Sequence, residues 1–473
     1  MEKSHLVHIL RTLEKKEIRD LKKWVASPAH NLRQDVVELL EYLMSGKHLH
    51  DAASLGKEKV FSVLYPGRTF SDAEMRQAIH FLLKAVEDFL VFHENLKDEV
   101  RTKAVLARVY RQRQLPKLFQ KTMDTGQEMQ KKQPFRNHHF LENEYAFQFE
   151  QYNYLAGLGR SVPYNLQEVS DSSDLLFMAN KLKISCLMVA HQAVFKSDYR
   201  MKFLDGVLEY IKGNEHTLNF PAIGIYYYGY KALTNQEQEE YYQKLKEQIV
   251  TSSDLFPQEE IRVIYLMAIN YCINRINAGK APFWKEAFEM YNHGLKRQTF
   301  LENGILSRFT FMNAITTALK LHEYGWVESF IHEFSPFLEE KHRENFVKFH
   351  LARLYFEKKN YDKAMKFLAQ SDYSDLLMSL NAKTMLLKMY YELEEYTALD
   401  SLLESMRTYL QRKKVMGYHK VLYSNFVNLT RKLAKLSPFD SEGQKKLGNE
   451  VRNADPLSTS ERQWLLEQLD KIS

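Results

Sequence analysis

Helical periodicity runs through most of the chain and constrains its fold more than any other feature. Apolar residues recur at steps of three and four, which place them on one face of an α-helix. Glycine (17 of 473 residues) and proline (11) are scarce, so the frequent turns of a β-sandwich or barrel have little support. We therefore predict an all-α protein with almost no strand. The first apolar stripe predicts a single helix ending before Pro28 and consists of Leu6, Ile9, Leu10, Leu13, Ile18, Leu21 and Trp24.

The N-terminal part of the chain differs from the rest. A chain of 473 residues exceeds the size of one hydrophobic core, so it must divide into domains or extend as a repeat array. Residues 1–96 are predicted to form a distinct N-terminal helical module. Within it, Ser71 and Glu74 have the spacing of a capping box, which would begin a helix that runs to about Leu96. The apolar run at 60–65 is ambiguous between a short helix and a strand.

Beyond this module, at 97–436, most of the predicted helices come in pairs. The loop at 156–174 is a possible break in the array, and 437–456 is predicted to be a linker. Residues 457–473 are predicted to form a C-terminal helix that folds back and caps the array. The expected helices are about 100–113 with 115–131, 137–156 alone, 174–195 with 199–212, 220–233 with 236–250, 258–277 with 283–297, 305–322 with 326–338, 344–358 with 361–370, 380–392 with 396–411, and a long helix at 414–436.

A repeat of 35 residues is visible toward the C-terminus. Trp326, Tyr361 and Tyr396 follow one another at this interval. An aromatic residue at the turn would fill the wedge between two helix pairs, and a small residue would let the helices of a pair approach where they cross. A second set of residues keeps step with the first and consists of Ser329, Ala364 and Leu399.

The run Leu351-Ala352-Arg353-Leu354-Tyr355, followed by Tyr361 and Ala364, resembles the tetratricopeptide repeat. The resemblance covers roughly residues 300–411. It implies a right-handed α-solenoid of stacked antiparallel helix pairs, which presents a groove to a protein or peptide. Three positions depart from the repeat pattern: Lys348 occupies the position of the usual Trp, Ala352 that of Gly, and Leu368 that of Phe. The proline that usually closes the repeat is also absent.

The N-terminus carries a second resemblance, to the starts of uncharacterised bacterial helical-repeat proteins. This resemblance implies no activity. The residues that carry it are Leu13, Glu17, Leu21, Trp24, Ser27-Pro28 and Asn31.

No residue pattern indicates catalysis, a cofactor or a metal site. The sequence has no phosphate-binding glycine loop and no nucleophile elbow, and its histidines lack the spacing of zinc ligands. Cys186 and Cys272 lie in apolar helical runs, which excludes a disulfide scaffold and indicates a reducing compartment. No stretch approaches about 18 uncharged apolar residues, and the N-terminus lacks a secretory signal. We expect a cytoplasmic protein with no membrane span, no cofactor and no enzymatic activity.

Aromatic clusters are the first candidate binding surface. Tyr226, Tyr227 and Tyr230 lie close together in the sequence and would suit a groove, because tyrosine offers large contact area and a hydroxyl at low entropic cost. The alternative is packing between repeats. Consecutive tyrosines cannot all face the core, so we expect some of them to be exposed.

Basic helix faces are the second candidate. The net charge of +6 is small, but residues 97–136 carry eleven Lys or Arg against four Asp or Glu. A second basic face lies at 412–435, opposite an apolar stripe and without acidic residues, and could bind an anion. The alternative is an ordinary solvated face. The residues of this basic stripe are Lys413, Lys414, Lys420, Arg431, Lys432 and Lys435.

Three functions remain open on the sequence alone. The first is a non-enzymatic scaffold that binds a protein or peptide in the groove of a helical-repeat array. The second is binding of nucleic acid or another polyanion along the basic faces, which the small net charge does not favour. The third is a helical enzyme whose site assembles only in three dimensions. A small-molecule ligand is not expected.

Overall fold

The computed structural model describes residues 1–159, 162–195, 197–370, 376–412 and 417–472. Helices account for 79% of these residues, so the all-α prediction is confirmed. None of the helices in these ranges is both long and apolar enough to cross a membrane. The chain forms two compact units, Met1–Asn180 and Lys181–Ser473.

The first unit begins with helices packed around one apolar core, which gathers buried residues from Leu6 to Phe89. A second core gathers residues from Val100 to Phe147. The division from the second unit falls within α9 (Leu166–Phe195), which begins inside the loop expected at 156–174. The other helices of this unit are α1 (His5–Leu10), α2 (Lys15–Ala26), α3 (Gln34–Met44), η1 (His48–His50), η2 (Ala52–Leu55), α4 (Lys57–Leu64), α5 (Asp72–Lys97), α6 (Glu99–Gln112), α7 (Pro116–Lys132) and α8 (His138–Gly157).

Local capping explains two departures from the predicted N-terminal helices. The single helix expected up to Pro28 is wrong, because Glu14 and Glu17 form a capping box that starts α2 anew after α1. At the start of α5 the Ser71 hydroxyl accepts a hydrogen bond from the Glu74 amide, as expected. The Glu74 carboxylate instead pairs with Arg68 at 2.7 Å. In the ambiguous run at 60–65, residues 60–64 belong to helix α4 and Tyr65 is its C-cap.

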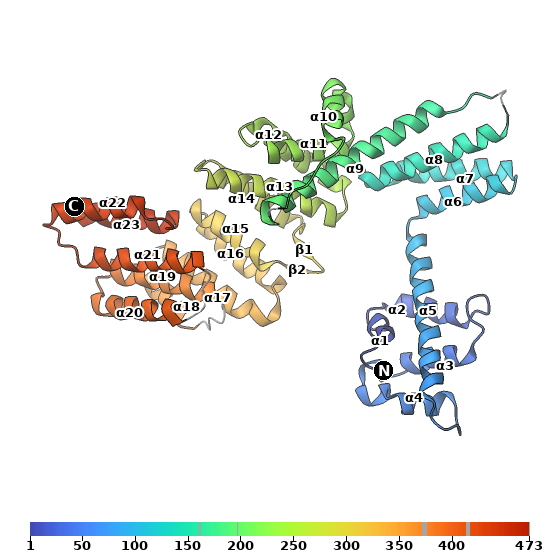
Figure 1. Cartoon of the computed structure of the whole chain (residues 1–473), viewed down its shortest axis with the longest axis horizontal. Helices are drawn as coiled ribbons and strands as arrows, with labels where there is room; N and C mark the ends of the chain where they lie inside the picture. The colour runs from blue at the N-terminus through green and yellow to red at the C-terminus, as the bar shows by residue number, and fades with distance from the viewer. Residues whose placement is uncertain (160–161, 196, 371–375, 413–416, 473) are drawn as a thin grey trace. The chain divides into compact units, whose positions relative to one another are not determined.

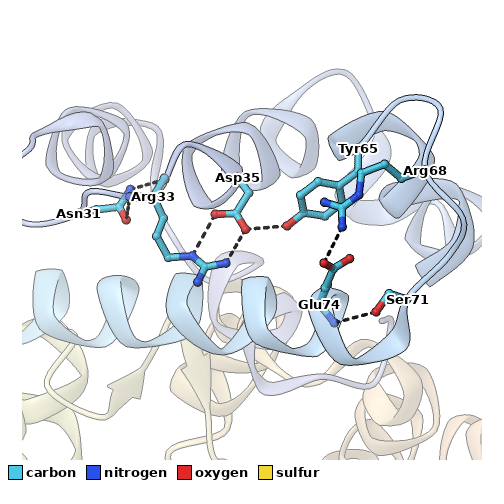
Figure 2. Close-up of polar contacts among 7 residues, drawn as sticks. All are labelled: Asn31, Arg33, Asp35, Tyr65, Arg68, Ser71 and Glu74. Carbon is cyan, nitrogen blue, oxygen red and sulfur yellow. Dashed lines mark hydrogen bonds and ion pairs between the residues drawn. The ribbon is translucent and has the colours of Figure 1, made fainter.

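A polar network ties α3 to the end of α4 (Figure 2). Arg33 donates two hydrogen bonds to Asp35, at 3.0 and 2.6 Å, and the Tyr65 hydroxyl donates a third at 2.6 Å. Burial raises the pKa of Asp35, but the bonds from Arg33 and Tyr65 outweigh it and leave the pKa below its ordinary value. Burial and the bond to Asp35 raise the pKa of Tyr65 to about 12. Asp35 therefore stabilises this unit as a carboxylate.

The second unit consists of α-helices that contact their sequence neighbours, interrupted in its described part by one β-hairpin (Figure 1). Contacts also join alternate helices: α11 touches α13, α15 touches α17, and α17 touches α19. Its elements are α10 (Leu204–Gly213), η3 (Glu215–Asn219), α11 (Pro221–Thr234), α12 (Glu239–Ser252), η4 (Ser253–Leu255), α13 (Gln258–Asn277), α14 (Phe283–Lys296), β1 (Leu301–Glu302), β2 (Ile305–Leu306), α15 (Arg308–Lys320), α16 (Tyr324–Phe334), η5 (Ser335–Phe337), α17 (Glu340–Glu357), α18 (Tyr361–Ala369), α19 (Leu376–Glu392), α20 (Tyr396–Arg412), α21 (Gly417–Ala434), α22 (Ser441–Asn453) and α23 (Thr459–Ile472).

One backbone corner recurs between paired helices. At the end of α17, Lys359 adopts φ +58°, and its amide bonds to the Phe356 carbonyl while the Asn360 amide bonds to the Tyr355 carbonyl. This is a Schellman motif, which satisfies the last carbonyls of the helix. Asn360 is also the N-cap of α18, so only Lys358, Lys359 and Asn360 separate the two helices. The same pair of backbone bonds, with a left-handed residue, occurs between helices at Gln114, Gly279, His322 and Glu394, and at Gln298 between α14 and the hairpin.

The corners identify which residues of α16, α18 and α20 occupy equivalent positions. Tyr361 and Tyr396 each lie two residues after the left-handed residue and begin a helix. The equivalent residue of α16 is Tyr324 rather than Trp326, so the 35-residue interval to Trp326 does not join equivalent positions. Three residues after Tyr324, Tyr361 and Tyr396 lie Val327, Ala364 and Leu399, and all three have no exposed surface. Ser329, which the 35-residue interval pairs with Ala364, is exposed.

The C-terminal segment corrects another expectation. The linker expected at 437–456 contains α22, because Asp440 caps the helix and Leu447 and Val451 bury their side chains. The sequence of α22 is mostly polar, so apolar periodicity does not predict this helix. The last helix, α23, packs against α21 and α22.

Two polar contacts tie α23 to α19. Lys388 pairs with Glu461 at 3.0 Å, and Trp464 donates a hydrogen bond to Glu392 at 2.8 Å. Glu392 also accepts a hydrogen bond from Tyr361 at 2.5 Å. This carboxylate therefore joins α18, α19 and α23.

The corrected register gives a stability prediction. Ala364→Phe should overpack the buried face of α18 and lower the free energy of unfolding by about 1–3 kcal/mol. Ser329→Phe, at the position that the 35-residue interval would make equivalent, should change it by less than about 0.5 kcal/mol. Thermal and urea melts of both variants measure the difference. Equal destabilisation by the two would restore Trp326 as the repeat position.

The Asp35 network gives a pH prediction. Tyr65→Phe should cost about 1.5 kcal/mol at pH 7, the scale of a hydrogen bond to a charged group. A carboxylate whose folded pKa is lowered stabilises above its unfolded pKa near 4, and loses this stabilisation as the pH falls through the folded value. The cost should therefore shrink below about pH 4. Urea unfolding at pH 7 and at pH 3 measures it, with the half-exposed Tyr210→Phe as control. A cost that stays unchanged on acidification contradicts the role of the ionised carboxylate.

Candidate functional site

The tyrosines singled out from the sequence pack inside the second unit. Tyr226 and Tyr227 expose 2% and 8% of their surface, and Tyr230 is half-buried. The Tyr226 hydroxyl donates to Glu260 at 2.7 Å, and Lys183 pairs with the same carboxylate at 3.0 Å. Burial raises the pKa of Tyr226 above its ordinary value. Tyr226 and Tyr227 therefore hold α11 in place and offer little surface to a partner.

Two residues of the basic stripe form ion pairs with acidic residues from other helices. Arg431 pairs with Glu404 of α20 at 3.0 Å, and Lys432 pairs with Glu450 of α22 at 2.5 Å. The stripe contains no acidic residues of its own, but the fold brings carboxylates of other helices to these two positions. Lys420 and Lys435 are exposed. The remaining two members, Lys413 and Lys414, lie outside the described residues.

Three arginines of the basic segment at 97–136 pair with carboxylates of α8. Arg101 contacts Glu142 of α8 at 2.8 Å. Arg108 and Arg111 both bind Glu150, at 2.7 and 3.0 Å, and this carboxylate is almost completely buried. These three arginines attach α6 to α8, so part of the local positive charge stabilises the fold.

Neither cysteine is prepared for nucleophilic chemistry. Cys186 and Cys272 are both buried and unpaired. Burial raises the pKa of the Cys186 thiol and brings that of Cys272 to about 12, which keeps both as thiols at neutral pH. In the part of the chain that the structure describes, no group of three or more His, Cys, Asp or Glu could hold a metal ion.

A recess of about 820 Å³ lies in the second unit beside the β-hairpin, and we name it the hairpin groove. Its floor is one face of α13, where the lining residues follow at helical steps. Leu266 and Ile273 are half-exposed there, while Ile269 is buried. The opposite face of α13 is apolar too and belongs to the core, with Ile264, Tyr265 and Ala268 buried. The lining residues on α13 are Arg262, Leu266, Ile269, Asn270 and Ile273.

The hairpin forms one wall of the groove. β1 pairs antiparallel with β2, and the two turn residues Asn303 and Gly304 adopt φ +51° and +77°. Positive φ at both positions defines a type I′ turn, for which Asn-Gly is the preferred sequence. Phe300 anchors the base of the hairpin in the core, where its ring lies so close to Gly294 that an added Cβ would meet it at 2.5 Å. Ile305 points its side chain to the surface and is 45% exposed.

The first turns of α15 and α17 supply the remaining sides. Ser307 caps α15, and Phe309 in its first turn is 60% exposed. His342 of α17 is exposed, whereas Phe346, one turn further, is buried. Exposed aromatic and aliphatic surface therefore meets polar groups along an open recess. The lining residues from these two helices and the segments before them are Ser307, Arg308, Phe309, Thr310, Asn313, Leu338, Glu339, Lys341, His342 and Phe346.

The charges of the groove are unevenly paired. Arg262 forms an ion pair with Glu302 of the hairpin, and Lys341 lies 3.8 Å from Glu339. Arg308 lies 5.0 Å from the centre of the Phe309 ring. No acidic partner of Arg308 is found among the described residues. Arginine and lysine thus outnumber carboxylates on the described lining of this groove.

The sequence does not predict this groove. Asn303-Gly304 between apolar residues is a strong hairpin signal, but the helical periodicity led us to expect a helix from residue 305, and that expectation is wrong at β2. The other lining residues come from segments spread over 262–346, and no local pattern marks them as neighbours.

Comparison with models of protein families, with curated proteins and with solved structures found no match in any of the three. The groove is therefore interpreted from its own geometry.

The paired charges give a prediction about polyanions. The double variant Arg431→Gln, Lys432→Gln should leave binding to single-stranded RNA, duplex DNA and anionic vesicles unchanged, because both cations are already paired with carboxylates of the fold. A salt titration of parent and variant measures it. If the stripe bound a polyanion, the log–log slope of affinity against salt would change by about 0.7–0.9 for each phosphate that the variant no longer binds. Steep salt dependence in the parent that disappears in the variant would support polyanion binding.

Proposed function

We propose that this protein is a non-enzymatic scaffold that binds an extended segment of a partner protein in the hairpin groove. The observation that carries the proposal is a recess of about 820 Å³ floored by an apolar face of α13 that no other described element of the unit fills. The lining stripe from Arg262 to Ile273 spans twelve residues, whose first and last Cα atoms lie about 16 Å apart along the helix. An extended segment of about five residues has this length. The hairpin groove is elongated and open, which suits a peptide better than a small enclosed ligand.

The proposed architecture is a right-handed, tetratricopeptide-like solenoid. Two observations support it: the same backbone corner joins several helix pairs, and alternate helices such as α15 and α17 touch. In such an array the first helix of each pair faces the groove, which fits the apolar character of α13 on both faces. A cytoplasmic location agrees with two unpaired, buried cysteines.

The polyanion alternative has less support. Arg101, Arg108 and Arg111 are used within the fold, and so are Arg431 and Lys432 of the stripe. A helical enzyme has no supporting observation, since the groove holds no cluster of titratable groups in mutual hydrogen-bond contact within the described residues.

A blocking variant tests the proposal. Peptides of about 12 random residues, long enough to span the groove floor twice over, are displayed on phage and selected on the full chain, and the selected peptides are titrated by fluorescence polarisation. Asn270→Trp should weaken them at least about tenfold, because Asn270 is exposed on the groove floor and an indole there fills the recess without disturbing the core. Asn449→Trp, at an exposed position of α22 outside the groove, should change affinity less than about twofold.

Circular dichroism and thermal melts should be the same for both tryptophan variants and the parent. Selection of no binding peptide, or equal affinity for the parent and Asn270→Trp, contradicts a peptide site in the groove.

A further inference from the structure

We infer that the hairpin groove selects segments in which an acidic side chain lies next to an apolar anchor, and that Arg308 receives the carboxylate. This inference rests on the proposed function and names the class of segment that the groove binds.

The first step concerns the pairing of charge. Arg262 and Lys341 each have a carboxylate nearby within the groove, on Glu302 and Glu339. Arg308 lines the same recess, is exposed, and has no acidic partner among the described residues. An arginine presents a fork of donors that matches both oxygens of a carboxylate. Arg308 is therefore the lining cation best able to accept an anion from a partner.

The second step concerns the surroundings of Arg308. Its guanidinium lies over the ring of Phe309, a cation–π contact that favours one placement of the side chain. The first-turn amides of α15 add partial positive charge beside it. The Phe309 ring is 60% exposed, and Ile305 of the hairpin is 45% exposed. An apolar side chain that covers these two residues would lie next to the guanidinium.

The third step separates a carboxylate from a phosphate backbone. Glu302 and Glu339 lie on the lining of the same groove and are exposed. A chain of phosphates laid along the recess would meet both, at a cost in repulsion. A single carboxylate directed at Arg308 avoids them. The arrangement of charge therefore favours an acidic peptide over a nucleic acid.

The experiment uses the groove-dependent peptides selected on the full chain. Their sequences should be enriched in Asp or Glu adjacent to an aliphatic or aromatic residue. For one such peptide, an acid-free version is made by replacing Glu or Asp with Gln or Asn, and a charge-swapped version by replacing it with Lys. Affinities are measured for the parent chain, Arg308→Glu, and the matched control Lys320→Glu, an exposed position at the other end of α15.

We expect Arg308→Glu to weaken the acidic peptide at least about tenfold and the acid-free peptide less than about threefold. The charge-swapped peptide should bind Arg308→Glu more tightly than it binds the parent, which a merely structural loss would not produce. Lys320→Glu should leave all three affinities within about twofold. Peptides that depend on the groove but show neither acid enrichment nor a response to Arg308→Glu overturn this inference and leave the proposed function standing. Peptides that ignore Asn270→Trp overturn the proposed function itself.

Discussion

The backbone corner between helices is the constraint on which the second unit depends. The C-terminal end of every helix leaves backbone carbonyls without intrahelical partners, and a chain with so little sheet must satisfy them locally. Here a left-handed residue and the residue after it bond back to the last turn, and in α17–α18 the second of them already caps the next helix. Since the turn is this short, the two helices must run antiparallel and in contact. The position of the next helix face is then fixed by the corner and not by the loop sequence.

Glycine is not required for these corners. Lys359, Glu394 and His322 occupy the left-handed position at φ between +58° and +61°, and among the corners of the described chain Gly279 alone follows the usual preference. A left-handed backbone costs a side-chain-bearing residue about 1 kcal/mol or more, so the packing of the paired helices must compensate for it. Tyr361 and Ala364 illustrate this compensation: one bonds to Glu392 of the next helix, and the other is completely buried. The corner and the packing thus support each other.

This dependence on corners explains which features could be predicted from the sequence. Helical periodicity is local, so most helices are predicted within a few residues of their observed ranges, although α9 begins eight residues before its predicted start. Register depends on where each corner lies, and no glycine marks the corners at His322, Lys359 and Glu394. The 35-residue interval therefore makes Trp326, rather than Tyr324, the equivalent of Tyr361. The helix at Ser441–Asn453 escapes prediction because two apolar residues, Leu447 and Val451, suffice to attach it.

Local sequence patterns could not predict the hairpin groove. Its residues extend from Arg262 to Phe346 and become neighbours only once α13, α15, α17 and the hairpin are in place. Asn303-Gly304 indicates the turn, but a turn alone does not indicate a recess.

The net charge of a helix surface is difficult to judge from the sequence alone, because ion-pair partners lie far apart along the chain. Arg275 pairs with Glu237 at 2.7 Å across 38 residues, and Lys246 pairs with Glu286 across 40 at the same distance. Partners therefore lie about 40 residues apart in the sequence, and a helix that is uniformly basic by itself can be neutralised by its neighbours in the folded chain. The same reasoning gives meaning to an exposed cation in a recess when such a partner is missing from the described residues. Arg308 is such a residue, next to an open apolar surface, and a carboxylate from another chain can take the place that a neighbouring helix fills elsewhere.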